Sequence, residues 1–204
     1  MVAKSPALRS FQHRNFRILY PANALSNIGT WAQRVAQDWL VLQLTNNDPT
    51  NLGLVTAIQF LPAMLLSTYG GLLADRFSKR KLLFITNLGA GLASLVLGLL
   101  VMANSVQLWH VYALALLVGI FSAIDSPIRI SFTSELVGKD DLANAVSLNS
   151  ANFNAGRLIG PALSGYLIAS FGTGPSFVLN TLTYGVMVVT LLFIRDQDLH
   201  ITTK

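Results

Sequence analysis

Residues 52–73 read LGLVTAIQFLPAMLLSTYGGLL, and residues 82–103 read LLFITNLGAGLASLVLGLLVMA. Neither stretch contains a charged side chain, and each has the roughly 20 mostly apolar residues that a helix needs to cross about 30 Å of hydrocarbon. Residues 177–194, FVLNTLTYGVMVVTLLFI, repeat the pattern. These three stretches predict membrane-spanning helices, and the rest of the chain has to be interpreted around them.

The composition agrees with a chain whose main solvent is lipid. Of the 204 residues, 52% are hydrophobic and 11% are charged, against roughly a quarter charged in a soluble domain. The sequence therefore predicts an all-α integral membrane protein, a six-transmembrane-helix bundle. The first and fifth windows are more polar, and a helix lying on the membrane surface is the alternative for the first. The six windows are 16–44, 52–74, 81–103, 108–132, 143–170 and 175–194.

Basic residues alternate between the connections. The tail 1–15 and the start of the first window are basic, as are the turn 76–81, the segment around Lys139 and the tail 195–204. The intervening loops, 46–51, 104–107 and 172–174, contain no Lys or Arg. Because cytoplasmic loops collect Lys and Arg, we expect both termini in the cytoplasm and the bundle in a bacterial inner membrane. This topology also explains the net charge of +5 without a nucleic-acid partner.

Polar residues recur along one face of the first window. At about 100° per residue they fall in one arc, and Leu25, Ile28, Val35 and Trp39 fall opposite. Charged side chains are unfavourable against lipid, so this arc is expected to line a water-filled cavity or the interior of the bundle. A path for a small-molecule substrate is its simplest use. The cavity candidates on this arc are Asn23, Asn27, Thr30, Arg34 and Asp38.

Two pairs of opposite charge stand four residues apart. Arg34 and Asp38 share a face of the first window, and Asp125 and Arg129 share a face of the fourth, the spacing of a helical ion pair. Mutual neutralisation without substrate contact is the alternative for both. Arg157 has no acid four residues away, so Asp38 is its expected partner. For this sixth cavity candidate we predict gating, coupling or anion attraction, with structural bridging as the alternative.

Residues 71–81, GLLADRFSKRK, resemble the loop Gly-x-x-x-Asp-Arg-x-Gly-Arg-Arg/Lys of major facilitator superfamily (MFS) transporters. Ser and Lys occupy positions 78 and 79, where the family has Gly and Arg. We expect Gly71 to permit close helix approach and Asp75 to meet the amino terminus of a facing helix. The gating candidates are Gly71, Asp75, Arg76 and Arg80, together with Asp125 and Arg129.

Residues 156–165, GRLIGPALSG, resemble the Gly-Pro motif of MFS exporters. Gly156, Gly160 and Ser164 form a ridge of small residues for tight helix contact, and Pro161 kinks or stiffens the helix. Ordinary membrane packing explains the glycines equally well, but the Gly-Pro pair less well. The motif, which ends at Gly165, implies efflux.

Segments 15–45 and 126–150 are similar to the enterobactin-exporter-like branch of MFS secretion transporters, and the similarity covers nearly the whole chain. It implies half of an MFS fold, built from two inverted three-helix repeats, and a secondary active transporter exporting drug- or siderophore-like molecules by alternating access. No cofactor is implied beyond a proton or other ion gradient. Proton-coupled drug antiporters carry Arg where this chain has Ala115, so Arg129 or Arg157 would replace it.

The resemblance also implies twelve helices in two halves, of which this chain supplies the amino-terminal one. We expect either a fragment completed by a carboxy-terminal half, with 195–204 as tail or start of the linker, or assembly with a second copy or separate partner. An inactive membrane scaffold is the alternative. An enzyme is disfavoured, since the chain lacks a phosphate-binding Gly-Lys-Ser/Thr loop and zinc-type His spacing, and metal is not expected. The expected partners are the lipid bilayer and the substrate.

Overall fold

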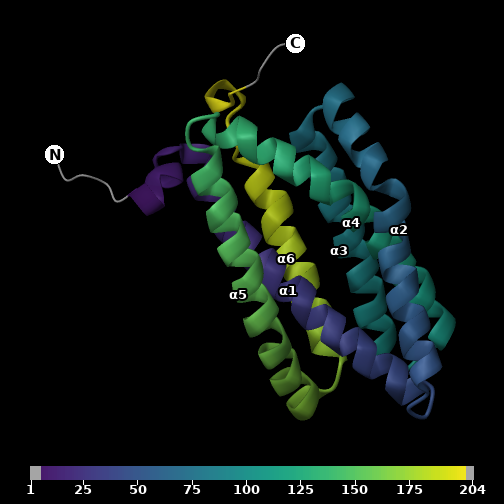
Figure 1. Ribbon diagram of the computed structural model, residues 1–204. Coiled ribbons are helices and arrows are strands. Elements are labelled where there is room, and N and C mark those ends of the chain that lie inside the picture. Colours follow the sequence, from purple (N-terminus) through teal and green to yellow (C-terminus); the bar gives the residue numbers. More distant parts are fainter. Residues whose placement is uncertain (1–5, 201–204) are drawn as a thin grey trace.

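Six long helices make up the bundle in this computed structural model (Figure 1). The structure describes residues 6–200, so Lys4 and Lys204 of the predicted basic tails lie outside the described residues. A short 3-10 helix precedes the bundle and another follows it. In chain order the elements are η1 Pro6–Gln12, α1 Arg14–Leu44, α2 Pro49–Arg76, α3 Lys79–Met102, α4 Leu108–Val137, α5 Leu142–Phe171, α6 Gly174–Leu192 and η2 Asp196–Asp198.

Local signals set where several helices begin and end. The Asp48 side chain accepts a hydrogen bond from the backbone N–H of Thr50 at 2.9 Å, and Pro49 occupies the first turn of α2. Both features favour a helix start. Gly138 and Gly172 follow the ends of α4 and α5 with φ of 73° and 81°, a backbone region that glycine adopts without steric cost. These turns reverse the chain within a few residues.

The packing relates α1–α3 to α4–α6. Helix α1 packs mainly against α5 and α6, α4 packs mainly against α2 and α3, and α3 packs against α6. Exchanging the first three helices with the last three maps the α1–α5 contact onto α4–α2, the α1–α6 contact onto α4–α3, and the α3–α6 contact onto itself. Both described ends of the chain lie at one end of the bundle (Figure 1). This arrangement fits two three-helix repeats in half of an MFS fold.

Glycines allow two of these helix pairs to approach closely. A Cβ at Gly160 of α5 would lie 2.6 Å from the Cβ of Trp31, and one at Gly156 would lie 2.8 Å from the Cβ of Asn27. On α2 the close approach is made by Gly70, whose Cβ would lie 2.6 Å from Pro127 of α4. A Cβ at Gly71 would meet nothing of the described chain within 4 Å, so the close approach predicted for Gly71 is not made within this bundle.

Two buried apolar clusters hold the bundle together, one near each end. One includes Phe16, Phe132 and Met187, and the other includes Val55 and Phe177. By length and composition α2, α3, α4 and α6 are apolar enough to cross a membrane. Helix α1 packs inside the bundle with many buried residues, so the surface-helix alternative does not hold. Its polar face and that of α5 line the space between the two clusters.

Candidate functional site

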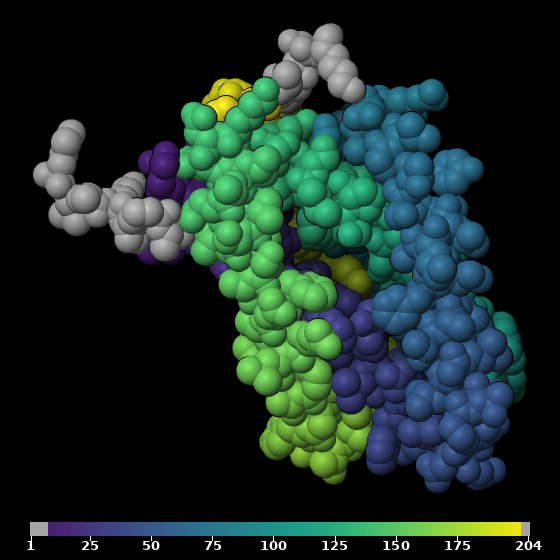
Figure 2. All heavy atoms as spheres, viewed as in Figure 1, coloured from purple at the N-terminus to yellow at the C-terminus, as the bar shows by residue number. Residues whose placement is uncertain are grey.

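A cleft of about 620 Å³ lies between the two repeats. Figure 2 shows the hollow between α5 on one side and α4 and α2 on the other, with parts of α1 and α6 visible deeper in. Residues of α1, α3, α4, α5 and α6 line it. The polar lining residues are Asn23, Ser26, Asn27, Thr30, Thr86, Asn87, Ser122, Asp125, Ser126, Arg129, Thr133, Asn149, Ser150, Asn154 and Tyr184.

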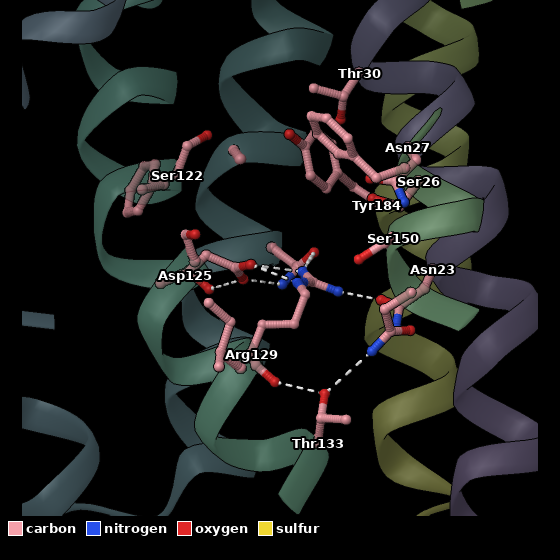
Figure 3. A pocket seen from close by; sticks show the side chains of 18 of the residues that line it. Asn23, Ser26, Asn27, Thr30, Ser122, Asp125, Arg129, Thr133, Ser150 and Tyr184 are labelled. Atoms are coloured by element: carbon pink, nitrogen blue, oxygen red, sulfur yellow. Dashed lines mark hydrogen bonds and ion pairs between the residues drawn. The ribbon is translucent and has the colours of Figure 1, made fainter. Parts of the chain in front are cut away.

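An ion pair on α4 lies in the wall of this cleft (Figure 3). The Nε of Arg129 donates to Oδ2 of Asp125 at 2.7 Å. The other carboxylate oxygen, Oδ1, accepts hydrogen bonds from Thr86 at 2.8 Å and from Asn87 at 2.7 Å. Arg129 also donates to Oδ1 of Asn23 on α1. The predicted Asp125–Arg129 pair therefore forms, and three helices hold it.

Apart from the Asp125–Arg129 pair, the lining of the cleft is uncharged. Because Asp125 and Arg129 satisfy each other, the cleft offers a ligand mainly amide and hydroxyl groups, with aromatic rings from Phe121 and Phe153. Among the described residues, the buried Oδ1 of Asn149 has no hydrogen-bond partner. Buried acceptors are normally satisfied, so this oxygen is an unusual feature of the cleft wall. The arrangement suits reversible binding of a small polar or amphiphilic compound.

The predicted pair on α1 does not form. Asn23, Asn27 and Thr30 line the cleft as expected, but no carboxylate of the described residues lies within ion-pair distance of Arg34. Its guanidinium carbon instead lies 4.5 Å from the ring centroid of Trp31 and 4.9 Å from that of Phe60. Side chains on a helix lean toward its amino terminus. Arg34 therefore reaches Trp31, three residues earlier, rather than a residue that follows it.

Arg157 also contacts Trp31 instead of its expected partner Asp38. The guanidinium carbon lies 5.7 Å from the ring centroid of Trp31. Within the described part of the chain, Arg157 makes no ion pair and no hydrogen bond through its side chain, which is exposed. Phe153, one turn earlier on α5, lines the cleft and contacts the Trp31 ring edge-to-face at 5.7 Å. The two arginines thus stand just beyond one end of the cleft.

The loop between α2 and α3 lies at the end of the bundle that carries both termini. Arg80 donates to the backbone carbonyls of Leu191 at 2.7 Å and Leu192 at 3.0 Å, and pairs with Asp196 at 2.9 Å. It therefore caps the carboxyl end of α6, where free carbonyls favour a cation. Asp75 and Arg76, the last two residues of α2, are exposed and, within residues 6–200, form no ion pair.

Several cleft residues were not predicted from the sequence. Thr86 and Asn87 hold Asp125 from α3, and Tyr184 lines the cleft from α6. One signal was available, since Thr86 and Asn87 are adjacent polar residues inside an otherwise apolar window. Pro161 leaves α5 helical on both sides, and a Cβ at Gly165 would meet nothing within 4 Å. The described residues contain no group of three His, Asp or Glu placed to hold a metal ion.

The helical architecture and the polar cleft between two apolar clusters define a polytopic membrane protein of the transporter class. The sequence matches the profile of the transmembrane secretion effector family over residues 5–200, and the chain belongs to this MFS family. The matching residues form an amino-terminal six-helix half of the MFS fold.

The relatives of this chain include siderophore and multidrug transporters. The chain is 29% identical to the staphyloferrin A transporter of Staphylococcus aureus, over 86% of this chain and 44% of the relative. It is 24% identical to the enterobactin exporter EntS of Shigella flexneri (90% and 45%) and 28% identical to the multidrug resistance protein MdtG of Enterobacter lignolyticus (80% and 38%). The chain spans less than half the length of these curated relatives.

Proposed function

We propose that this chain forms the amino-terminal half of a secondary active transporter that exports small molecules by alternating access. The observation that carries the proposal is the cleft, a polar space of about 620 Å³ walled by helices apolar on the outside. In MFS transporters the substrate is bound between two six-helix bundles that rock around it. Export is favoured by the Gly156–Gly165 motif and by the exporters among the relatives.

The orientation follows from where the basic residues lie. Arg9, Arg14, Lys79 and Arg80 gather at the end of the bundle that holds both termini, where Lys79 pairs with Glu135 at 2.6 Å. The positive-inside rule assigns such an end to the cytoplasm. We therefore place both termini on the cytoplasmic side of the inner membrane, with Arg34 and Arg157 toward the outer side.

The rest of the substrate path comes from outside this chain, either from a carboxy-terminal half or from a second copy. The exposed Asp75 is free to meet the amino terminus of a helix in that second bundle, as the resemblance implies. Such a contact would hold one state of the transport cycle closed at the cytoplasmic side. An ion gradient supplies the energy in this scheme, and the structure offers Arg129 and Arg157 as its charged groups.

Two serines on α5 provide a matched test. Ser150 lines the cleft and Ser147 does not, although both are exposed and both hydrogen-bond at 2.9 Å to the carbonyl four residues earlier. In the source bacterium, small molecules in the medium are compared between the deletion strain and strains carrying each variant. We expect Ser150→Trp to abolish secretion of at least one compound that Ser147→Trp preserves.

Two results would count against the proposal. One is a deletion strain whose secreted compounds match those of the wild type. The other is equal secretion from the two variants at equal protein levels. A further measurement is the native mass of the tagged protein in mild detergent. A stable 22.1 kDa monomer without any partner would favour an inactive scaffold.

A further inference from the structure

We propose that Arg34 and Arg157, arranged around Trp31, form a binding site for a carboxylate group at the outer end of the cleft. The inference rests on the proposed function, because it treats the cleft as the substrate path. It adds that the exported molecules include compounds with an aromatic or amphiphilic body and at least one carboxylate. The site is separate from the Asp125–Arg129 pair, whose charges already compensate each other.

Among the described residues, the two arginines lack direct partners for their positive charges. In the described part of the chain neither guanidinium forms an ion pair or a hydrogen bond, and the Nε of Arg34 is buried without a partner. Asp38 stands one turn beyond Arg34 on α1 and interacts with it electrostatically, but it lies outside ion-pair distance of both groups. Cations that lack a direct ion-pair partner within a membrane bundle are costly and mark functional sites. Two of them beside one ring can attract an anion.

Both arginines contact the indole ring of Trp31 in a way that leaves their N–H donors free. The indole of Trp31 lies within 6 Å of both guanidinium carbons, at 4.5 Å from Arg34 and 5.7 Å from Arg157, the range of a cation–π contact. A cation–π contact involves the flat face of the guanidinium group or its charge. The N–H groups at the edge therefore remain available as hydrogen-bond donors to a ligand. Arginine presents these donors as a planar fork that matches the two oxygens of a carboxylate.

The two arginines and Trp31 lie beside the cleft. Thr30 and Phe153 line the cleft, and their helix neighbours Trp31 and Arg157 lie just beyond it. A ligand whose body occupies the uncharged, aromatic-bearing cleft can therefore extend a carboxylate to the two arginines. The polar cleft binds the body of the ligand, and the arginines select its charge.

The experiment uses benzoate as the probe and benzamide as its uncharged counterpart. The chain has three tryptophans, so a Trp39→Phe/Trp109→Phe background leaves Trp31 as the only indole reporter. The chain in lipid nanodiscs is titrated with each compound while Trp31 emission is recorded. We expect saturable binding of benzoate, at least about tenfold stronger than that of benzamide, because charge-assisted hydrogen bonds are about twice as strong as neutral ones.

Variants assign the binding to the two arginines. Arg34→Gln and Arg157→Gln should each weaken benzoate binding about tenfold, as expected when a hydrogen bond to a charged group is lost. Arg34→Lys keeps the charge but loses the planar fork and should give an intermediate loss. Arg17→Gln is the matched control, since it removes the same charge from an exposed position near the other end of α1. It should leave the affinity within about twofold, because a distant exposed charge is screened.

A second titration distinguishes a substrate carboxylate from one supplied by the missing bundle. It uses the assembled transporter purified from its own host, in the same tryptophan background. Benzoate binding there supports the inference. Binding to the isolated chain but not to the assembly would mean that the second bundle supplies the carboxylate, and the inference would be overturned.

Absence of benzoate binding in both preparations would overturn it as well, and so would equal effects of Arg34→Gln and Arg17→Gln. These results are independent of the serine test. If Ser150→Trp still blocks secretion while benzoate does not bind, the carboxylate site fails and the proposed export function stands.

Discussion

Helices α1 and α4 begin the two repeats and carry the same pair of charges at the same spacing, yet only one pair closes. In α4 Asp125 precedes Arg129, and the long Arg side chain leans back along the helix onto the carboxylate. In α1 Arg34 precedes Asp38, so the same lean carries the guanidinium away from the acid and onto Trp31. Spacing alone is therefore insufficient, because the order of the residues decides which contact forms.

The difference divides the molecule into two chemical regions. The α4 pair is saturated by Thr86, Asn87 and Asn23, and it ties α1, α3 and α4 together. The arginines near Trp31 have no such partners in the described chain. We infer that the first region contributes mainly to the stability of the bundle and the second mainly to recognition.

Removal of one arginine from each region should give the largest difference between the two regions. Arg129→Ala leaves the carboxylate of Asp125 without its cation, and removing one member of a buried pair costs about 3–5 kcal/mol. Arg34→Ala removes no ion pair and should cost about 1 kcal/mol or less, in the range of a lost cation–π contact. Unfolding of the purified chain by added sodium dodecyl sulfate, followed by circular dichroism, measures both.

The double variant Asp125→Asn/Arg129→Gln tests the reason for the loss. It removes both charges at once and should recover part of the stability lost in Arg129→Ala, because no buried charge is left unpaired. Equal destabilisation by Arg129→Ala and Arg34→Ala would remove the division between the two regions.

Each repeat has a helix that approaches a helix of the other repeat closely at a glycine, and substitution of these glycines tests that packing. Gly160→Leu places a side chain against Trp31 and Ile28 of α1, where a Cβ already lies within 3 Å of backbone atoms. Overpacking of this kind costs about 1–3 kcal/mol. Gly165→Leu adds the same side chain where nothing lies within 4 Å and should leave the unfolding transition nearly unchanged.

Helix α2 offers the equivalent pair. Gly70→Leu should destabilise the bundle, because Gly70 contacts Pro127 and Ile124 of α4, while Gly71→Leu should not. A larger loss at Gly71 than at Gly70 in the same unfolding assay would contradict the packing described here.

Sequence analysis predicted the fold well because apolar windows and the loops between them report directly on helices in a membrane. It located the cleft face of α1 through Asn23, Asn27 and Thr30, since helical periodicity fixes which residues share a face. It found the α4 pair through spacing. These features depend on residues near one another in the chain.

The sequence did not predict contacts between distant segments. Thr86 and Asn87 reach Asp125 only because α3 packs on α4, and Arg157 reaches Trp31 only because Gly156 and Gly160 bring α5 close to α1. Within this bundle Gly70, and not the predicted Gly71, makes the close approach, for a related reason. A family motif indicates that a glycine is present, but the rotation of the helix decides which of two adjacent glycines faces its neighbour.

The role of residue order can be tested by rebuilding the α4 arrangement in α1. Thr30→Asp places a carboxylate four residues before Arg34, the order found in α4. We expect Arg34 to leave the Trp31 ring and pair with the new acid, with a stability gain of only about 0.3–0.5 kcal/mol. The emission of Trp31 in the Trp39→Phe/Trp109→Phe background reports the departure. Asp38→Asn is the control and should leave that emission unchanged, because Asp38 is not in contact with the guanidinium.

The smallest effect is expected for the aspartates that precede α2 and α5, two helices that occupy corresponding places in the two repeats. Asp48 precedes α2 and Asp141 precedes α5, and the pKa of each lies below the ordinary aspartate value. For Asp48 the main cause is the backbone N–H of Thr50. For Asp141 it is the hydrogen bond with His13 at 2.9 Å, with Arg9 at 3.1 Å adding to it. Asp141 thus holds η1 on the bundle, whereas Asp48 holds only its own helix.

A carboxylate with a lowered folded-state pKa stabilises the structure above its unfolded pKa, near 3.9, and this stabilisation is lost as pH falls through the folded value. We therefore expect residues 8–13 to exchange amide hydrogens faster as pH falls below about 4, once exchange is corrected for its intrinsic pH dependence. Asp141→Asn should show the fast exchange already at neutral pH, while Asp48→Asn should leave this segment protected. Equal protection of the segment in both variants would mean that the apolar contacts of Phe11 and the hydrogen bonds from Ser10 to Asn144, and not the carboxylate of Asp141, hold it in place.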